Sequence, residues 1–537
     1  SASSNRRRKC EVVTPKSPCT WCQDRQLTCS FTSSTARKKD WSETHWEPRP
    51  YDSSSETGIR DEVASSADYQ AAPSTSIGLP SNALRIELVE LYFRYIHDTF
   101  HSLFHRPSLM QDVIDETIPE VLLFGIISLS SRFSNDPVFT GVDPRVRGRP
   151  YARKAQALLD LREVSLTTIQ ACVLLGAFVI TEGEAASEAV FYSIACRSAL
   201  VLDLPNLPGQ FLLDQEANRR VWWTLRMIDV WSSNGVRIPR ALGATCSDVP
   251  HPMNEIIFHR LRRGDDSERT DHLSNTTPQA LSQESGSSLL TQMVKLNAIL
   301  IDISSVNQAA AAASLSRHGP PRNCRSANKE LNGWVGSLPP NLRDTQDNLS
   351  HYAALGLGPM FVAVHLGYYH YGALLYYQYL HRDSYDEHAP TYSYADKCKT
   401  HSVGLSEILY RAFSTPGCEV YYTMVGHVLV IASTVPLHIL LFNSDEEQTR
   451  AARGRLEKNF ELLTCLQRLW PTLDVSFARF REFHRACQNY KETSFRMDKW
   501  LLRFLLEFAN PVGEKDPDEP LTETHPWSMQ EWDLSPF

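Results

Sequence analysis

The stretch IQACVLLGAFVI, residues 169–180, is apolar over almost its whole length. A second stretch of this kind, VFYSIACRSALVLDL, covers residues 190–204. A helix that is apolar on nearly every side is typical of the centre of a large helical protein, where neighbouring helices cover it. We therefore predict that both stretches form central helices.

Segments with a single apolar face accompany these central stretches. From Ser81 onward, apolar residues recur every three or four positions, which is the spacing of one face of a helix. Three such stripes are Leu84, Leu88, Tyr92, Tyr95, Ile96 and Phe100; Leu289, Met293, Leu296, Leu300 and Ile303; and Leu456, Phe460, Leu463 and Leu469. The last stripe follows Ser444-x-x-Glu447, a capping-box pattern. No convincing run of alternating strand residues is present, so the predicted fold class is all-α, with one large multi-helix domain.

Charge is distributed unevenly over the 537 residues, 22% of which are charged. The first 40 residues hold nine Lys or Arg against three acidic residues, which gives them a net charge of +6. The remaining residues have a net charge of −14, so the net charge of the whole chain is −8. A cationic head on an acidic body predicts that only the head approaches a polyanion such as nucleic acid.

Composition divides the chain into five predicted parts. Residues 37–80 are rich in Ser, Thr, Pro and charge and poor in aliphatic residues, which favours a flexible, disordered linker. The predicted parts are a small cationic, cysteine-containing segment at 1–36, the linker at 37–80, a first part of the helical body at 81–345, the C-terminal helical part of the same body at 346–510, and an acidic-aromatic tail at 511–537. For the tail we leave two interpretations open: an activation segment that folds on a partner, or a plain solvated end.

Four cysteines near the start, Cys10, Cys19, Cys22 and Cys29, follow four consecutive cations at residues 6–9. Thiolates at this close spacing suit zinc, and Lys or Arg beside them suits phosphate. The other eight cysteines are scattered through apolar segments without a framework spacing, as expected of reduced, buried thiols.

This segment resembles the last two thirds of the binuclear zinc cluster of fungal transcription factors, whose pattern is C-x2-C-x6-C-x5-12-C-x2-C-x6-8-C. The second cysteine of the pattern would fall at Ser3, and the first would precede Ser1. Because the chain also begins without Met, we expect the reading frame to continue upstream. The resemblance implies two zinc ions in an intact cluster and at most one with the cysteines present. It assigns the metal to Cys10, Cys19, Cys22 and Cys29, and DNA contacts to Arg6, Arg7, Arg8 and Lys9.

A second resemblance, to the fungal-specific regulatory domain (middle homology region) of the same proteins, covers roughly residues 85–345. Its motifs occur in order along the chain. They are Leu91-Tyr92-Phe93 to His97 with Phe104-His105-Arg106-Pro107-Ser108-Leu109; Tyr192 to Leu204; Glu216-Ala217-Asn218-Arg219-Arg220-Val221-Trp222-Trp223 with Asp229; Arg237-Ile238-Pro239; and Leu331 to Pro340 with Trp334. On physical grounds alone, Glu216 and Arg220 are i,i+4 partners, and we expect this element to serve packing and ion pairing rather than direct contact with an effector.

Together the two resemblances imply a nuclear, sequence-specific, zinc-dependent DNA-binding regulator of RNA polymerase II transcription that reads CGG-type triplets. The implied partners are double-stranded DNA, coactivators or corepressors and a small-molecule effector, with no membrane. The alternative is a regulatory or adaptor protein that keeps the helical body but does not bind DNA. We expect no enzyme, since G-x-S-x-G, H-E-x-x-H and G-x-x-x-x-G-K-[ST] are all missing.

Two apolar segments have competing interpretations. Residues 425–442 form a run of about 18 residues that could cross a membrane, but it holds His427, Pro436 and His438, which favour a buried core helix. Residues 361–379 contain six tyrosines and two histidines, which either pack between helices or line a small-molecule pocket.

Overall fold

The computed structural model describes residues 78–99, 101–207, 209, 211–243, 249–265, 288–313, 324–381 and 392–516. The chain separates into two units, Ser1–Ser74 and Thr75–Phe537, and all described residues belong to the second. The predicted zinc-binding segment, nearly all of the predicted linker and the tail from residue 517 onward lie outside the described residues.

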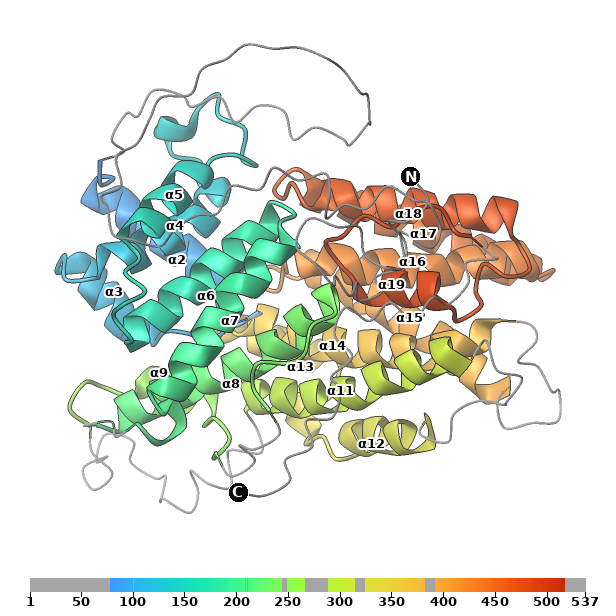
Figure 1. The fold of residues 1–537 in the computed structure, drawn as a ribbon, viewed down its shortest axis with the longest axis horizontal. Coiled ribbons are helices and arrows are strands. Elements are labelled where there is room, and N and C mark those ends of the chain that lie inside the picture. The colour runs from blue at the N-terminus through green and yellow to red at the C-terminus, as the bar shows by residue number, and fades with distance from the viewer. Residues whose placement is uncertain are drawn as a thin grey trace, which may run out of the picture. The chain divides into compact units, whose positions relative to one another are not determined.

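The described residues confirm the all-α prediction (Figure 1), because every regular element among them is a helix and the strand-like pairing there is limited to one isolated bridge, His97 to His101. The first half contains α2 (Asn82–Tyr95), α3 (Arg106–Ile114), α4 (Glu120–Ser130), η1 (Ser131–Phe133), η2 (Pro137–Phe139), α5 (Arg149–Leu158), α6 (Leu166–Thr181), α7 (Ala185–Val201), η3 (Leu204–Asn206), α8 (Leu212–Val236) and α9 (Glu255–Arg260). The second half contains α11 (Leu289–Ala313), α12 (Cys324–Gly336), η6 (Pro340–Leu342), α13 (Gln346–Ala354), α14 (Gly358–Tyr376), η7 (Tyr377–Leu380), α15 (Tyr392–Ser414), α16 (Met424–Phe442), α17 (Glu446–Gln467), α18 (Leu473–Asn489) and α19 (Lys499–Leu506).

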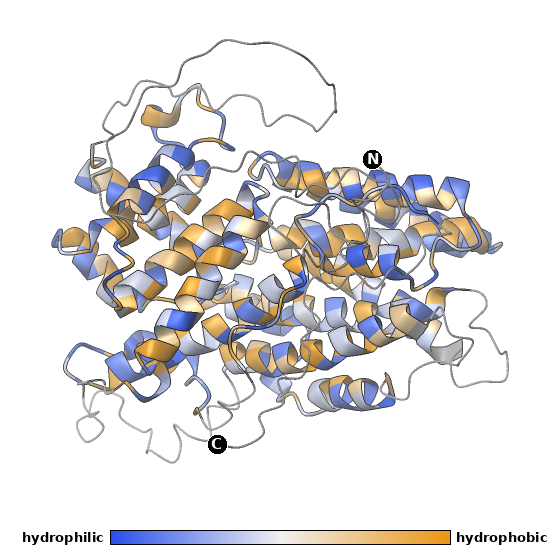
Figure 2. Ribbon diagram, viewed as in Figure 1, coloured by the Kyte–Doolittle hydropathy of each residue, from blue (hydrophilic) through white to orange (hydrophobic). Residues whose placement is uncertain are grey.

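One continuous hydrophobic core runs from Leu84 to Val512 and therefore includes both predicted parts of the body. Helix α6 packs against α4 and α7, and α14 packs against α11 and α15. Almost every residue of α6 is buried, as predicted for a central helix. In Figure 2 the apolar colouring is strong on the central helices, while α17 and α18 alternate between apolar and polar residues.

Helix α7 differs from its prediction as a helix covered on all sides. Val190 is 59% exposed and Val201 is 68% exposed, although both lie in the apolar stretch 190–204. The reason is that α7 packs mainly against α6 and α8, so its outer face meets solvent. Apolar composition thus overestimated the burial of this helix.

Helix α16 is buried along most of its length. It is one of two described helices, with Leu289–Ala312, that are long and apolar enough to cross a membrane, and 83% of its most apolar window is covered by the rest of the body. This burial agrees with the core helix predicted at residues 425–442. The neighbouring α17 begins one residue later than the Ser444 cap predicts, because the side chain of Asp445 accepts hydrogen bonds from Glu447 N and Gln448 N.

The first six residues of the predicted tail, 511–516, belong to the helical body. Val512 is 7% exposed and Lys515 is 2% exposed. Lys515 Nζ lies 2.7 Å from a carboxylate oxygen of Asp498 and donates to Thr493 O at 2.9 Å, and Trp500 Nε1 donates to Gly513 O at 2.7 Å. The acidic-aromatic composition placed Lys515 in the tail, but its partner Asp498 lies 17 positions earlier in the chain.

Close packing of α6 on α7 generates a stability prediction. A Cβ atom at Gly176 would lie 2.3 Å from Cε1 of Tyr192, so we expect Gly176→Ala to force these helices apart and destabilise the chain by about 1–3 kcal/mol. Gly454→Ala, in α17 with no atom within 4 Å of its Cβ, should instead stabilise by about 0.5–1 kcal/mol. Urea unfolding measures both, and a Gly176→Ala variant as stable as the parent chain would contradict this packing.

Candidate regulatory site in the helical body

The residues predicted to bind zinc and DNA, Cys10, Cys19, Cys22, Cys29 and the cations at 6–9, lie outside the described residues. Within the part of the chain that the structure describes, no group of three or more His, Cys, Asp or Glu side chains converges as a metal site would require. The candidate site built here is therefore the surroundings of α8, which carries the predicted element Glu216 to Asp229.

Glu216 and Arg220 form a buried ion pair at the start of α8. Glu216 is fully buried and Arg220 is 2% exposed. The Oε1 atom of Glu216 accepts from Arg220 Nε at 3.0 Å and from Met253 N at 2.9 Å, while Oε2 accepts from Arg219. This confirms the predicted i,i+4 pairing and shows that the carboxylate also holds the backbone at Met253.

The guanidinium of Arg220 continues the network towards a second carboxylate. Its Nη2 donates to Met253 O at 2.8 Å and lies 3.7 Å from Glu255 Oε1, and its Cζ sits 4.1 Å from the centre of the Phe258 ring. The Nε and Nη2 atoms of this cation therefore both have partners, and its flat face rests on an aromatic ring.

Glu255 joins the network to α11. Its two oxygens accept from the Ser288 hydroxyl at 2.8 Å and from the backbone NH groups of Leu289 and Leu290 at 2.9 and 3.1 Å. A carboxylate at this place satisfies the free NH groups of the first helical turn and its charge complements the helix dipole. The start of α11 is thus fixed to α8 through two glutamates and an arginine.

The distal part of the predicted element fastens a different loop. Asp229, 6% exposed, accepts from Ala241 N and Leu242 N at 2.9 Å each. Trp223 Nε1 donates to Pro250 O at 2.9 Å. The family-like pattern E-x-x-R-R-x-x-W with a downstream Asp therefore has a structural explanation, in that its polar members bind backbone groups of residues 241–253.

The predicted motif between α2 and α3 is attached to the same helix. His97 Nε2 accepts from Leu103 N at 3.0 Å and Phe104 N at 3.1 Å, which closes the turn. Thr224 Oγ1 accepts from Ser102 N at 3.0 Å. Burial lowers the pKa of His101 to about 3, so this ring is neutral at physiological pH.

Three neighbouring hollows, which we call the central cleft, lie along α8, α11 and α14. Their volumes are about 230, 50 and 90 Å³. Met227 and Asn297 line both the first and the second, whereas Trp231, Met293 and Tyr371 line both the second and the third. Shared walls place the three hollows in a row, separated in part by methionine side chains, which adapt readily.

Cations surround the first hollow. Arg226, Arg240 and Lys295 line it together with the single carboxylate Asp229, whose oxygens are already engaged by backbone NH groups. Arg226 donates to Gly243 O. Burial and the nearby Lys295 lower the pKa of His251, which lines the same hollow. The hollow therefore has a net positive charge.

Two buried polar atoms without a hydrogen-bond partner belong to residues that line the other hollows. Asn297 is 5% exposed and its Oδ1 has no partner, and His370 is 2% exposed and its Nδ1 has none. Burial lowers the pKa of His370 to about 3, so the ring is neutral. The hydroxyl of Tyr371 accepts from Trp231 Nε1 at 3.2 Å and keeps its own proton free to donate. Tyr376, Tyr377 and Tyr379 pack in the core, as the packing interpretation of residues 361–379 expects, whereas Tyr371 lines two of the hollows.

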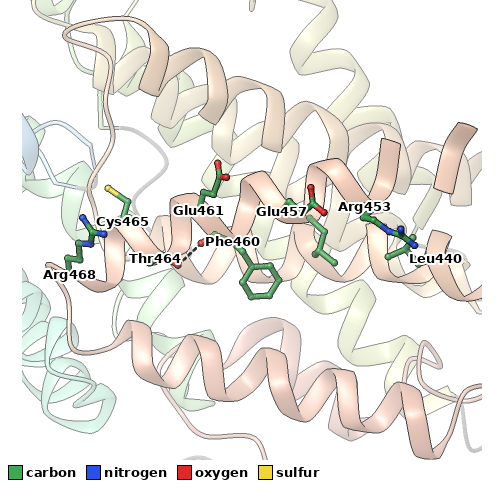
Figure 3. Close-up of a pocket in the computed structure, with 9 residues that line it drawn as sticks. Leu440, Arg453, Glu457, Phe460, Glu461, Thr464, Cys465 and Arg468 are labelled. Atoms are coloured by element: carbon green, nitrogen blue, oxygen red, sulfur yellow. Dashed lines mark hydrogen bonds between the residues drawn. The ribbon is translucent and has the colours of Figure 1, made fainter. Parts of the chain in front are cut away.

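A further hollow of about 850 Å³ lies open along α17 (Figure 3). Leu456 and Phe460 form its apolar floor, and exposed residues of both signs, Arg453, Glu457, Glu461 and Arg468, follow it along the helix. Equal numbers of positive and negative groups give this surface no preference for an anion or a cation. The central cleft is the more selective of the two.

Comparison with known proteins assigns a class to this body. Residues 89–334 match the family described as the fungal specific transcription factor domain, a little under half of the chain. The matched segment runs from α2 to α12 and includes the Glu216–Arg220–Glu255 network and much of the central cleft. Residues 89–334 of the body are therefore similar to this domain.

Relatives extend the similarity beyond this domain. An uncharacterized transcriptional regulatory protein of Schizosaccharomyces pombe is 23% identical over 54% of this chain and 32% of its own length. A Zn(2)-C6 fungal-type transcription factor of Fusarium oxysporum f. sp. lycopersici is 21% identical over 82% of this chain and 51% of its own length. The chain thus spans about a third to a half of these relatives, and the findings together support a place among fungal transcription factors.

Sequence reasoning found Glu216, Arg220 and Asp229 but missed Glu255, Asn297 and Lys295. Glu255 directly follows Asn254, a residue that commonly caps a helix, which was a local signal of a helix start at 255. Asn297 was also detectable, because it is a polar residue beside the apolar stripe of α11. The grouping of Lys295 with Arg226 and Arg240 depends on the approach of α8 to α11, which no local pattern contains.

The buried ion pair predicts a large effect of removing one partner. We expect Arg220→Met to destabilise the chain by about 3–5 kcal/mol, because Glu216 and Glu255 would keep buried charges without their shared cation. Arg485→Gln, which removes an exposed pair with Glu482, should cost under about 1 kcal/mol. Chemical unfolding of both variants measures the difference, and equal losses would contradict the role of the network.

Burial of neutral histidines predicts sensitivity to acid. His370 binds a proton below about pH 3 in the folded chain but near its usual pKa of 6.5 when unfolded, so the unfolded state takes up more protons as pH falls. This difference in proton uptake lowers the free energy of unfolding by about 2 kcal/mol at pH 5 relative to pH 8. Glu188 contributes a pH dependence of opposite sign to the free energy of unfolding, because burial raises its pKa to about 8 in the folded chain.

The test therefore compares pH dependences rather than single curves. His370→Gln should lose about 2 kcal/mol less than the parent chain between pH 8 and pH 5. A matched change at the exposed His484 should leave the pH dependence unaltered. Unfolding free energies at the two pH values supply the measurement, and identical slopes for His370→Gln and the parent would contradict the prediction.

Proposed function

We propose that this chain is a sequence-specific, zinc-dependent DNA-binding regulator of RNA polymerase II transcription that acts in the nucleus. The observation that carries the proposal is one chain with two features: a segment of four cysteines and four consecutive cations at residues 6–29, and a body whose residues 89–334 match the fungal specific transcription factor domain. Relatives whose names include "Zn(2)-C6" support the same interpretation.

The donor set fits zinc. Four thiolates, from Cys10, Cys19, Cys22 and Cys29, match the coordination number of one structural zinc ion. Bound zinc would supply folding free energy on the order of 10 kcal/mol to a segment too short for a hydrophobic core. The family's full pattern holds two ions with six cysteines, whereas this chain has Ser3 where the second cysteine of that pattern would fall.

The cations have complementary roles in this proposal. Arg6 and Arg7 would read guanine, because the guanidinium group forms paired hydrogen bonds with O6 and N7 and so suits CGG-type triplets. Arg8 and Lys9 contact phosphate, which adds affinity without sequence information. The acidic remainder of the chain would be repelled from DNA and is free to contact coactivators or corepressors.

Zinc and DNA binding can be tested together on the full chain. We expect about one zinc per chain by mass spectrometry of metals, and a gel shift with a CGG-containing duplex that weakens as salt rises. Cys19→Ser should abolish both zinc retention and the shift, whereas Arg6→Ala should retain zinc and lose preference for CGG. Cys465→Ser, at a half-buried free thiol of the body, is the control and should change neither.

The same experiment separates the alternative function. An adaptor that keeps the helical body without DNA recognition would show no zinc and no CGG-dependent shift, while its thermal unfolding stayed cooperative. The substitution of Ser3 for a pattern cysteine is the observation that favours this alternative. Zinc retention without any preference for CGG would reject the proposed base contacts but not the metal site.

A further inference from the structure

We propose that the central cleft is a binding site for a small amphipathic organic anion, with its anionic group among Arg226, Arg240 and Lys295 and its apolar part extending along Trp231, Met293 and Tyr371. As a binding site it stands independently of DNA recognition. Its role as an effector site rests on the function proposed above.

The charge of the first hollow selects the anionic end. Three cations and one carboxylate line it, and that carboxylate, Asp229, is occupied by the NH groups of Ala241 and Leu242. None of the three cations has an ion pair with another described residue. A carboxylate or sulfonate that entered here would meet several unpaired charges at the edge of a low-dielectric cleft, where an ionic contact is stronger than in open solvent.

The walls beyond the first hollow select an apolar body. Trp231, Met293 and Ala363 are partly exposed and line both of the smaller hollows, together with Tyr371 and Gly367. Aromatic and methionine side chains form adaptable contacts with flat or branched apolar groups. Pockets for small ligands are commonly lined in this manner, with a few polar groups that fix orientation.

Unsatisfied polar atoms supply those orienting groups. Asn297 Oδ1 and His370 Nδ1 are buried and have no hydrogen-bond partner, and their residues line the second and third hollows. A buried polar atom left unpaired costs about 1–3 kcal/mol. Such atoms also occur at packing positions among the described residues, as at Tyr192 and Trp222, but Asn297 and His370 line hollows. A ligand hydroxyl or amide at this depth would satisfy them.

A glycine on α14 keeps space for the apolar body. The closest atom to a Cβ built at Gly367 is Leu296 Cδ1 at 3.8 Å, so a small side chain is tolerated there without a clash. Gly367 lines both of the smaller hollows. The Cβ of a leucine at this position would therefore be accommodated, and the rest of its side chain would occupy the cleft where the ligand is proposed to lie.

The experiment uses the full chain and the fluorescent anion 1-anilinonaphthalene-8-sulfonate as the probe, displaced by either 4-phenylbutyrate or 4-phenylbutanol. These two competitors share an apolar body and differ in charge. We expect saturable probe binding, and displacement by the carboxylate at a concentration about tenfold lower than by the alcohol. Equal potency of the two compounds would overturn the anionic assignment.

Four variants locate the binding. Lys295→Gln should weaken the binding of 4-phenylbutyrate by about three- to tenfold and leave the binding of 4-phenylbutanol unchanged. Gly367→Leu should abolish binding of both compounds. The matched controls Lys329→Gln and Gly333→Leu, at exposed positions on α12, should bind as the parent does.

Probe binding at another place on the chain can be distinguished from binding in the central cleft. Probe binding that survives both Lys295→Gln and Gly367→Leu unchanged would place it elsewhere, for example in the open hollow along α17, and would overturn the proposal. Unfolding temperatures within about 2 °C of the parent exclude a folding defect as the cause of lost binding. Since no step uses DNA or zinc, failure here and failure of the proposed function are independent results.

Discussion

The ion pair between Glu216 and Arg220 is the constraint on which the arrangement of the central helices depends. Two charges removed from water are tolerated only when further hydrogen bonds satisfy them. Arg220 meets that requirement by reaching Met253 O and Glu255, and Glu216 meets it by accepting from Met253 N. Each added partner fixes another segment of backbone to α8, so one pair of charges holds the backbone at Met253 and, through Glu255, the first turn of α11.

The central cleft is a geometric consequence of this network. Glu255 holds the first turn of α11 in place, and Met293 and Asn297 follow one and two turns further along the same helix. On α8, Arg220, Met227 and Trp231 lie on one face, because their spacing of seven and four residues matches the helical repeat. One face of α8 therefore carries the buried Arg220 near the start of the helix and lines the central cleft further along. Contact between α8 and α11 is maintained by charged groups near Arg220 and by large side chains in the cleft.

The sequence predicted the fold where the physics is local and missed it where the partners are distant. Helical spacing identified α2, α11 and α17, apolar composition identified α6, and the i,i+4 rule identified the pair Glu216 and Arg220. It overestimated the burial of α7, because composition records how apolar a helix is but not how many neighbours cover it. It also placed Lys515 in the acidic-aromatic tail, although an ion pair with Asp498 and a hydrogen bond to a carbonyl group hold that residue in the body.

The candidate cleft was harder to predict than the fold for a related reason. Its walls come from α8, α11, α14 and α16, and only the tyrosine-rich stretch of α14 drew attention in the sequence. The overall charge of −8 gave no indication of a positive hollow, since Arg226, Arg240 and Lys295 lie 14 or more positions apart and are brought together only by the helix packing. Net charge describes the long-range field, whereas a binding site depends on the few groups within a Debye length of it.

The position of a polar group, and not its lack of a partner alone, distinguishes a site from packing in this core. Unpaired buried polar atoms lower the free energy of unfolding, and the described residues also hold such atoms away from the central cleft, as at Tyr192 and Trp222. Asn297 and His370 differ from these because they line hollows that share walls with one another and with a hollow surrounded by cations. A molecule bound in the central cleft would reach both polar groups and offset their cost.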